Sequence, residues 1–232
     1  MNTHISRDSL NTDTSSVGSV LYKAYTETTL NTDSYLSAYF TGLQEKLFKL
    51  NEAINHANAE SELKVKDALR DQYVRRIFSV TRGASDNFFE DLQLAGEKLQ
   101  KLLKNYGLSM LYESYATETG LINSLVQDFE KKEFSEAIAA IRGCAELINA
   151  LKEAQSDFEM AQANFGALTA KQNKAATATE LKLELIDDIN KRLIDYINGD
   201  WVPNKEACTE FALVVKQIVL KSNADVKRRQ AA

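Results

Sequence analysis

An unbroken apolar stripe between Leu36 and Ala57 constrains the fold of this chain more than any other feature. Its members alternate four and three residues apart: Leu36, Phe40, Leu43, Leu47, Leu50, Ile54 and Ala57. This spacing places every member on one face of an α-helix, which must pack lengthwise against neighbouring helices. We therefore predict a long helix that is capped by Asp33 or Ser34 and buried along one side.

Other stretches repeat this pattern and predict further helices. One stripe consists of Ala154, Phe158, Ala161, Phe165, Leu168, Gln172 and Ala175, and another of Phe88, Leu92, Ala95, Leu99, Leu102 and Tyr106. Gly107 follows the second stripe, where a left-handed residue commonly ends a helix. One proline and nine glycines in 232 residues are too few for a turn-rich β fold. The predicted class is all-α, an antiparallel bundle with left-handed, heptad-type packing.

Two internal matches indicate a duplicated helical unit. Ser19 to Tyr25 matches Ser109 to Tyr115, and Thr-Glu-Thr follows in both places. We predict two repeats of about three long helices each, residues 19–107 and 108–232, with an insertion near 128–150. Short linkers predict that successive helices run antiparallel. Residues 1–18 are polar, and we expect a disordered leader or one draped loosely over the bundle.

The remaining helices have less regular stripes. A helix starting at Ser61 is expected to bury Leu69, Tyr73, Ile77 and Val80. A longer helix is expected over 135–174, with Gly143 as either a kink or a point of close packing. A helix capped by Thr177 or Thr179 is expected to bury Leu185, Ile189, Leu193 and Ile197. The last helix carries Ala207, Phe211, Val214 and Ile218. Trp201, at the preceding turn, is expected to plug one end of the core, or else to anchor a partner.

Composition excludes several classes of protein. The net charge of −5 argues against a dedicated nucleic-acid-binding protein. No apolar run reaches the ~20 residues that span a bilayer, and the N-terminus lacks a signal-peptide pattern. Cys144 and Cys208 are far apart in sequence, which favours buried, reduced thiols. We therefore expect a cytoplasmic protein that binds neither membranes nor nucleic acids.

Positive charge gathers in two places, Arg70 to Arg82 and Lys216 to Arg229. These residues could hold an acidic partner or a nucleic-acid backbone. Acidic residues are interleaved with them and no aromatic platform accompanies them, so we interpret both stretches as solvated helix faces.

Motifs for catalysis and cofactor binding are absent from the sequence. The two histidines, His4 and His56, stand apart from each other and from both cysteines. A zinc or di-iron centre requires clustered ligands, and the phosphate-binding glycine motifs are missing. We predict no catalytic residues, no metal ligands and no cofactor.

One polar constellation occurs twice: Tyr22, Tyr25 and Glu27, then Tyr112, Tyr115 and Glu118. If the two repeats pack about a pseudo-twofold axis, these residues could form a seam that binds a cation or a small polar ligand. The alternative is structural. The tyrosines would then lie at the edge of the core, and each Thr-Glu-Thr would start a helix.

Several segments carry a family resemblance. They are Glu118-Thr119, Leu121 to Leu125, Leu147 to Leu151, Ala163-Asn164-Phe165 and the helix from Leu181 to Ile197. In these segments the chain resembles an uncharacterised family of all-helical proteins found mainly in Bacteroidetes. The resemblance implies a bacterial, cytosolic helical protein, and it implies no activity, cofactor or catalytic residue.

These observations support three functional hypotheses. The first is a non-enzymatic interaction or scaffold protein that binds another copy of itself or a different protein through an exposed helical face. The second is a small-ligand or cation binder that uses the tyrosine and glutamate seam. The third, an enzyme, has no visible constellation of acid, base and nucleophile to support it.

Overall fold

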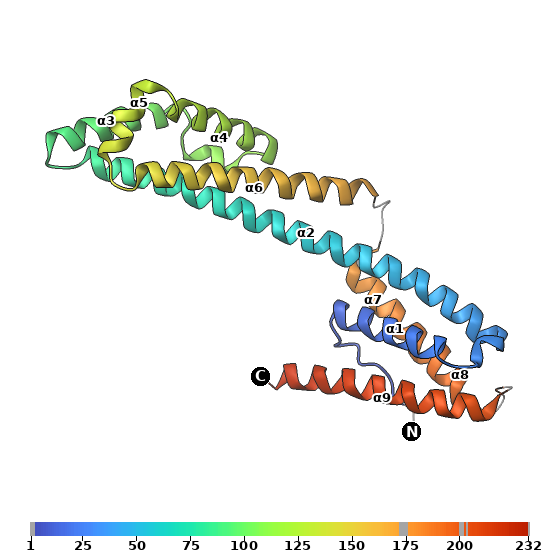
Figure 1. Cartoon of the computed structure of the whole chain (residues 1–232). Helices are drawn as coiled ribbons and strands as arrows, with labels where there is room; N and C mark the ends of the chain where they lie inside the picture. Colours follow the sequence, from blue (N-terminus) through green and yellow to red (C-terminus); the bar gives the residue numbers. More distant parts are fainter. Residues whose placement is uncertain (1–2, 172–175, 200–201, 203, 232) are drawn as a thin grey trace. The chain divides into compact units, whose positions relative to one another are not determined.

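The computed structural model describes residues 3–171, 176–199, 202 and 204–231, and every regular element in these ranges is helical (Figure 1). The predicted all-α class is confirmed. None of the described helices is both long enough and apolar enough to cross a membrane. Gln172, Ala175 and Trp201, for which we made predictions from sequence, lie outside the described residues.

The chain forms two compact units with boundaries other than the predicted ones. Unit 1 comprises Met1–Asn58 and Gln172–Ala232, and unit 2 comprises Ala59–Lys171. The predicted repeats, residues 19–107 and 108–232, do not coincide with these units, and the division into repeats stays a prediction. The mismatch is caused by helix α2 (Ser34–Ser85), whose first part belongs to unit 1 and whose second part belongs to unit 2.

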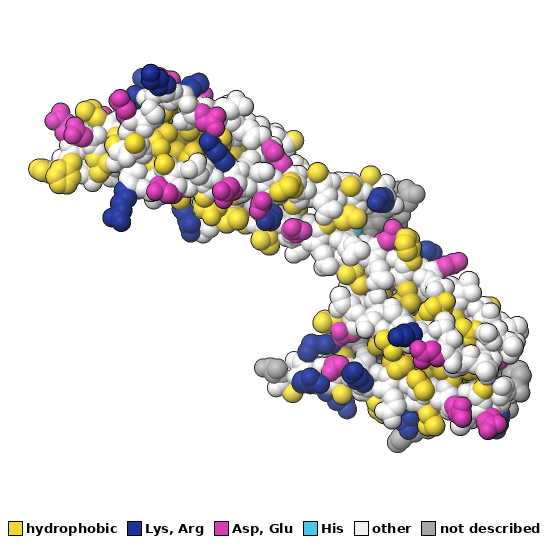
Figure 2. Space-filling view, in the orientation of Figure 1, with side chains coloured by type: hydrophobic (Ala, Val, Ile, Leu, Met, Phe, Trp, Pro, Cys, Tyr) yellow, Lys and Arg dark blue, Asp and Glu magenta, His cyan; other side chains and the backbone are white. Residues whose placement is uncertain are grey.

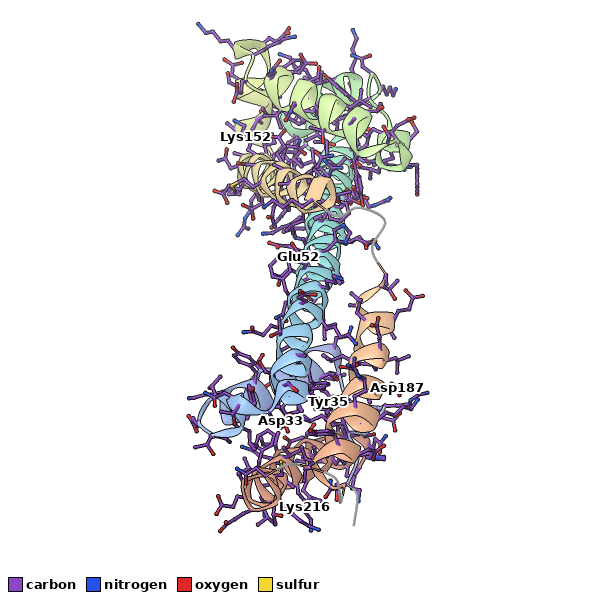
Figure 3. The ribbon with its side chains drawn as sticks, turned by 90° about the vertical axis from the view of Figure 1, so that its right-hand side faces the viewer. Asp33, Tyr35, Glu52, Lys152, Asp187 and Lys216 are labelled. Atoms are coloured by element: carbon purple, nitrogen blue, oxygen red, sulfur yellow. The ribbon has the colours of Figure 1, made fainter. Side chains whose placement is uncertain are left out.

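Helix α2 begins where the sequence predicted. The Asp33 carboxylate accepts hydrogen bonds from the backbone N–H groups of Tyr35 and Leu36, at 2.9 and 3.0 Å, at the start of the helix (Figure 3). The stripe from Leu36 to Leu50 is buried, as expected, whereas Ile54 is half-buried and Ala57 is exposed. The predicted long amphipathic helix is thus confirmed over the part that lies in unit 1.

The break expected before Ser61 is absent, and α2 continues for 52 residues. The prediction of a separate, antiparallel second helix is therefore wrong. No glycine or proline stands between Ala57 and Ser61, and a cap-type residue by itself does not end a helix. The backbone of this stretch keeps its helical hydrogen bonds. Residues of α2 up to Asn58 belong to unit 1, and those from Ala59 onward belong to unit 2.

Unit 1 surrounds the first part of α2 with α1 (Asn11–Thr26), η1 (Leu30–Thr32), α7 (Ala178–Asp188), the π-helical turn η3 (Ile189–Ile194), α8 (Asp195–Ile197) and α9 (Lys205–Gln230). Thr177 caps α7 as predicted, and Leu185, Ile189, Leu193 and Ile197 are all buried. Phe40 lies at the centre of the core, stacked on Tyr25 at 4.0 Å and edge-on to Phe211 at 6.1 Å.

Residues 1–18 are not a disordered leader over their described part. Residues from Asn11 onward form α1, and Ile5 is buried in the core of unit 1. Two asparagines fix the segment before α1. The Asn190 side chain bonds the N–H and C=O of Ile5 at 2.8 and 3.1 Å, and Asn223 bonds Ser6 N–H and His4 C=O at 2.9 and 2.8 Å. Polar composition indicated disorder here, but these long-range hydrogen bonds satisfy the backbone instead.

Unit 2 packs α3 (Glu90–Leu103), η2 (Leu108–Tyr112), α4 (Tyr115–Phe129), α5 (Lys132–Ala140) and α6 (Cys144–Lys171) around the second part of α2. Gly96 lets α3 approach the end of α2 closely. A Cβ at this position would clash with the backbone of Ala84 and Ser85 at the end of α2. The helix predicted over 135–174 is divided, because Gly143 has φ = +80° and a right-handed helix cannot continue through it.

The two matching sequence segments adopt different structures. Ser19 to Tyr25 lies within α1, whereas Ser109 to Tyr115 forms most of η2, the turn after it and the first residue of α4. Gly107 has φ = +69°, in the left-handed region as predicted, but it is not the C-cap of α3, which ends at Leu103. Ser114 caps α4. The sequence match therefore does not produce equivalent elements, and the duplication stays a prediction.

Candidate functional site

The most unusual feature of unit 2 is a fully buried arginine. Arg70 lies on α2 with no exposed surface, surrounded by side chains from α4 and α6. A buried charge is costly unless it is paired and hydrogen-bonded, so its surroundings identify a specific arrangement. From sequence we interpreted Arg70 as part of a solvated helix face, and that interpretation is wrong.

Every N–H group of the Arg70 guanidinium donates a hydrogen bond. Asp67, one turn earlier on α2, accepts from Nε and Nη2 at 3.1 and 2.8 Å, and Glu118 of α4 accepts from Nη2 at 2.7 Å. Nη1 donates to Thr119 Oγ1 at 3.0 Å and to Gln155 Oε1 of α6 at 3.2 Å. All five donors of the planar guanidinium are thereby used. Three helices are joined through one side chain.

Aromatic rings complete the pocket around the guanidinium. The Arg70 carbon Cζ lies 3.5 Å from the ring centre of Phe158 on α6 and 5.9 Å from that of Tyr115 on α4. The two rings meet edge to face at 5.2 Å. A cation over a desolvated ring gains electrostatic energy from the negative face of that ring. The rings thus exclude water and also stabilise the charge.

Three carboxyl groups, those of Asp67, Asp71 and Glu118, lie around Arg70, and its single positive charge cannot neutralise them all. We call these four residues the buried cluster. One oxygen from each of Asp67, Asp71 and Glu118 lies within 4.8 Å of the others. Burial, together with a hydrogen bond to Asp71, raises the pKa of Glu118 to about 8. Glu118 Oε1 and Asp71 Oδ1 are buried and have no other donor among the described residues. A proton held by Glu118 and donated to Asp71 satisfies both oxygens and removes one negative charge.

The predicted seam residues fall into two separate sets. Tyr22, Tyr25 and Glu27 lie in unit 1, where Tyr25 is buried against Phe40 and Glu27 is exposed. Tyr112, Tyr115 and Glu118 lie in unit 2. The structure brings Tyr115 and Glu118 together around Arg70, whereas Tyr112 is 79% exposed, with Arg75 5.8 Å from its ring centre. The idea of one seam formed by both sets stays a prediction.

Sequence reasoning missed Arg70, Asp67 and Asp71 because it placed the buried face of this helix in the wrong register. The buried positions are Leu63, Arg70, Val74, Ile77, Thr81 and Ala84, whereas Leu69, Tyr73 and Val80 are only half-buried. Arg70 therefore occupies a core position within an apolar stripe. Acidic residues three before and one after it were the available signal, since a buried arginine needs carboxylates nearby.

A second candidate lies at the turn between α2 and α3. Phe88 is 96% exposed and Phe89 71%, and their ring centres are 6.0 Å apart. Phe88 was predicted to be the first member of a buried stripe, but α3 begins only at Glu90 and its stripe is buried from Ala95 onward. Figure 2 shows hydrophobic side chains gathered at this end of unit 2. We call Phe88 and Phe89 the phenylalanine turn.

A family of unknown function (DUF6261) matches residues 60–212, about two thirds of the 232-residue chain. The chain belongs to the DUF6261 family. No curated protein and no solved structure matches it.

Both candidate sites lie within the region that matches the DUF6261 family. All residues around Arg70 and both residues of the phenylalanine turn lie within 60–212, whereas α1 and the first part of α2 precede it. The resemblance noted from sequence is thereby confirmed at the level of a family of unknown function. The family name brings no activity with it, so function must be argued from the site itself.

Proposed function

We propose that this protein is a non-enzymatic interaction protein and that it binds a partner through the phenylalanine turn. The supporting observation is the exposure of Phe88 and Phe89, two large aromatic side chains that meet water on a turn. Exposed aromatic residues carry much of the energy at protein interfaces. Asp86, Glu90 and Asp91 are exposed around them, so the partner surface should be apolar with a basic rim.

The buried cluster supports a non-enzymatic role because its charged groups pair with one another. The Arg70 guanidinium is fully hydrogen-bonded and Glu118 holds a proton at neutral pH. The thiol of Cys144 is equally unsuited to chemistry, since burial raises its pKa to about 11. We propose that both groups stabilise the fold and that neither turns over a substrate. We also propose a cytoplasmic location in a bacterium. Two buried, free cysteines fit the reducing conditions of a cytoplasm.

Replacing Phe88 and Phe89 by serine should abolish partner capture. The measurement is quantitative cross-linking and affinity capture in cells that produce the protein naturally, comparing the wild type with the F88S/F89S variant. We expect at least one protein to be enriched about tenfold or more with the wild type and lost with the variant, as for removal of hot-spot residues worth ~1.4 kcal/mol or more.

The matched control is Phe48→Ser, because Phe48 is 64% exposed but lies on α2 within unit 1. It should keep the full set of captured proteins. Identical capture by the wild type and F88S/F89S would show that the phenylalanine turn is not the binding surface.

The alternative is a cation binder, and the acidic excess of the buried cluster favours it. Asp67, Asp71 and Glu118 could each supply one oxygen to a small divalent cation, which would replace the Glu118 proton. Because Arg70 stays nearby and Glu118 must lose its proton, such a cation would bind better above pH 8. Of the six seam residues predicted from sequence, only Glu118 and the neighbouring Tyr115 lie at this site.

Thermal unfolding near pH 8.5 with about 5 mM Mg²⁺, Ca²⁺ or Mn²⁺ tests the alternative, since a ligand bound with Kd near 50 μM would stabilise by about 2.7 kcal/mol. Asp71→Asn should remove the effect, and Glu136→Gln, an exposed residue of α5, should retain it. The absence of a shift in the wild type, or an equal shift in Asp71→Asn, would exclude cation binding here.

A further inference from the structure

Helices α1 and α9 of unit 1 form an apolar groove that the functional proposal does not use. One hollow of about 430 Å³ is lined by Val17 and Val20 of α1 and by Ile218 and Lys221 of α9. A second, of about 370 Å³, is lined by Ala24 of α1, by Glu27 just after α1, and by Phe211, Val214 and Glu210 of α9. We call the two hollows together the α1–α9 groove.

The spacing of the lining residues shows that the hollows lie on one continuous face. On α1 and its C-cap the lining residues alternate four and three apart: Asp13, Val17, Val20, Ala24 and Glu27. On α9 the same spacing joins Ala207, Phe211, Val214, Ile218, Lys221 and Asp225. Residues so spaced share one side of a helix. The floor is apolar, yet Val20 and Val214 are each 46% exposed.

The exposure of Val214 results from the register of α9. We predicted that Ala207, Phe211, Val214 and Ile218 would face the core, but Cys208, Phe211, Val215 and Val219 are the buried residues. Of the apolar groove residues on α9, Phe211 belongs to the core and Ala207 and Ile218 pack against it, so Val214 is the one that stays exposed. Together with Val20 of α1 it leaves an exposed apolar patch in the groove, which a partner would cover.

Charges at the two ends of the groove identify the partner. Glu27 and Glu210 make the second hollow acidic. In the first hollow Asp13 and Asp225 are paired with Arg229 and Arg228, which leaves Lys221 as excess positive charge. Figure 2 shows the same polarity, with basic side chains gathered near the C-terminal end of α9 and acidic ones near its other end.

We infer that the α1–α9 groove binds a second copy of this chain in antiparallel orientation. A twofold axis perpendicular to the groove would place the acidic hollow of one copy on the basic hollow of the other, so that Glu210 and Lys221 pair twice. Val20 and Val214 of both copies would then pack at the centre, where α1 and α9 of one copy face α1 and α9 of the other.

The size of this face sets the expected affinity. Helix α1 has 16 residues, and a face about 24 Å long and two helices wide corresponds to roughly 500 Å² per copy. Interfaces of this size give weak, reversible association. The α1–α9 groove is a different surface from the phenylalanine turn. Dimerisation through the groove therefore extends the proposed interaction role without depending on that turn.

Analytical ultracentrifugation of the full chain from about 1 to about 300 μM is the test, since that range covers weak dimers. The wild type should dimerise reversibly, and V20K/V214K should remain monomeric with unchanged helix content. Val65→Lys is the matched control, because Val65 is 64% exposed on α2 in unit 2, and it should dimerise as the wild type does.

A charge exchange tests the antiparallel arrangement itself. Glu210→Lys and Lys221→Glu should each weaken the dimer about tenfold or more, and the double variant E210K/K221E should restore it, because both pairs re-form with reversed sign. A wild type that is monomeric throughout, a dimer that survives V20K/V214K, or a double variant weaker than either single one would overturn the inference. F88S/F89S should dimerise normally, which separates this result from that of the proposed function.

Discussion

Arg70→Met should destabilise unit 2 by about 3–5 kcal/mol, the cost commonly found when one partner of a buried ion pair is removed. The change eliminates five hydrogen bonds that join α2, α4 and α6 and the contact with Phe158 at 3.5 Å. It also leaves Asp67 without its counter-charge. Hydrogen exchange of α4 and α6 amides, measured as a function of urea, reports the stability of unit 2 separately from that of unit 1.

Arg82→Met is the matched control, because Arg82 lies on the same helix but is exposed. It should change stability by less than about 0.5 kcal/mol. Adding Glu118→Leu to Arg70→Met should recover much of the loss, since an apolar replacement no longer leaves a buried carboxyl unpaired. An Arg70→Met protein with wild-type exchange in α4 and α6 would show that the cluster does not stabilise these helices.

The stability of unit 2 should fall as the pH rises from about 4.5 to about 8. Glu118 has an ordinary pKa of 4.5 in the unfolded chain and a pKa of about 8 when folded, so between these values the folded state binds more protons. Stability from this group is therefore fully present below pH 4.5 and is lost as the pH passes 8. Converted at 1.36 kcal/mol per pKa unit, the loss is at most about 5 kcal/mol.

Glu118→Gln isolates this contribution from other titrating groups. Its amide can donate to Asp71 and accept from Arg70, as the protonated carboxyl does, but it cannot ionise. The variant should match the wild type near pH 5 and exceed it near pH 9 in urea unfolding followed by hydrogen exchange. Equal pH profiles for the two proteins would mean that Glu118 is already ionised in the folded state and that its pKa is not raised.

The predictions from sequence succeeded where one helix face decided the outcome. The stripe from Leu36 to Leu50, the cap at Asp33 and the left-handed Gly107 each depend on residues close together in the chain. A helix with one apolar stripe must bury it, so class and burial follow from spacing alone. The capping box at Thr177 and Glu180 is local for the same reason.

The predictions failed where a residue's partner is distant in sequence. Ile5 is held by Asn190, and Arg70 is held by Glu118 and Gln155. The residue pattern around Ile5 or Arg70 does not indicate which distant side chain will bind it, since these hydrogen bonds exist only after the helices have packed. For the same reason only Glu118 and Tyr115 of the cluster were singled out as candidates in advance.

The sequence by itself therefore determined the helical class, the start of α2, the apolar face of its first part and the turn at Gly107, because local geometry and burial of apolar area settle these features. Tertiary structure decided that α2 runs unbroken through two units, that Arg70 is in the core and that Val214 of α9 lines a groove. Whether a charge or an apolar stripe is buried depends on what packs against it, and only the folded chain specifies that neighbour.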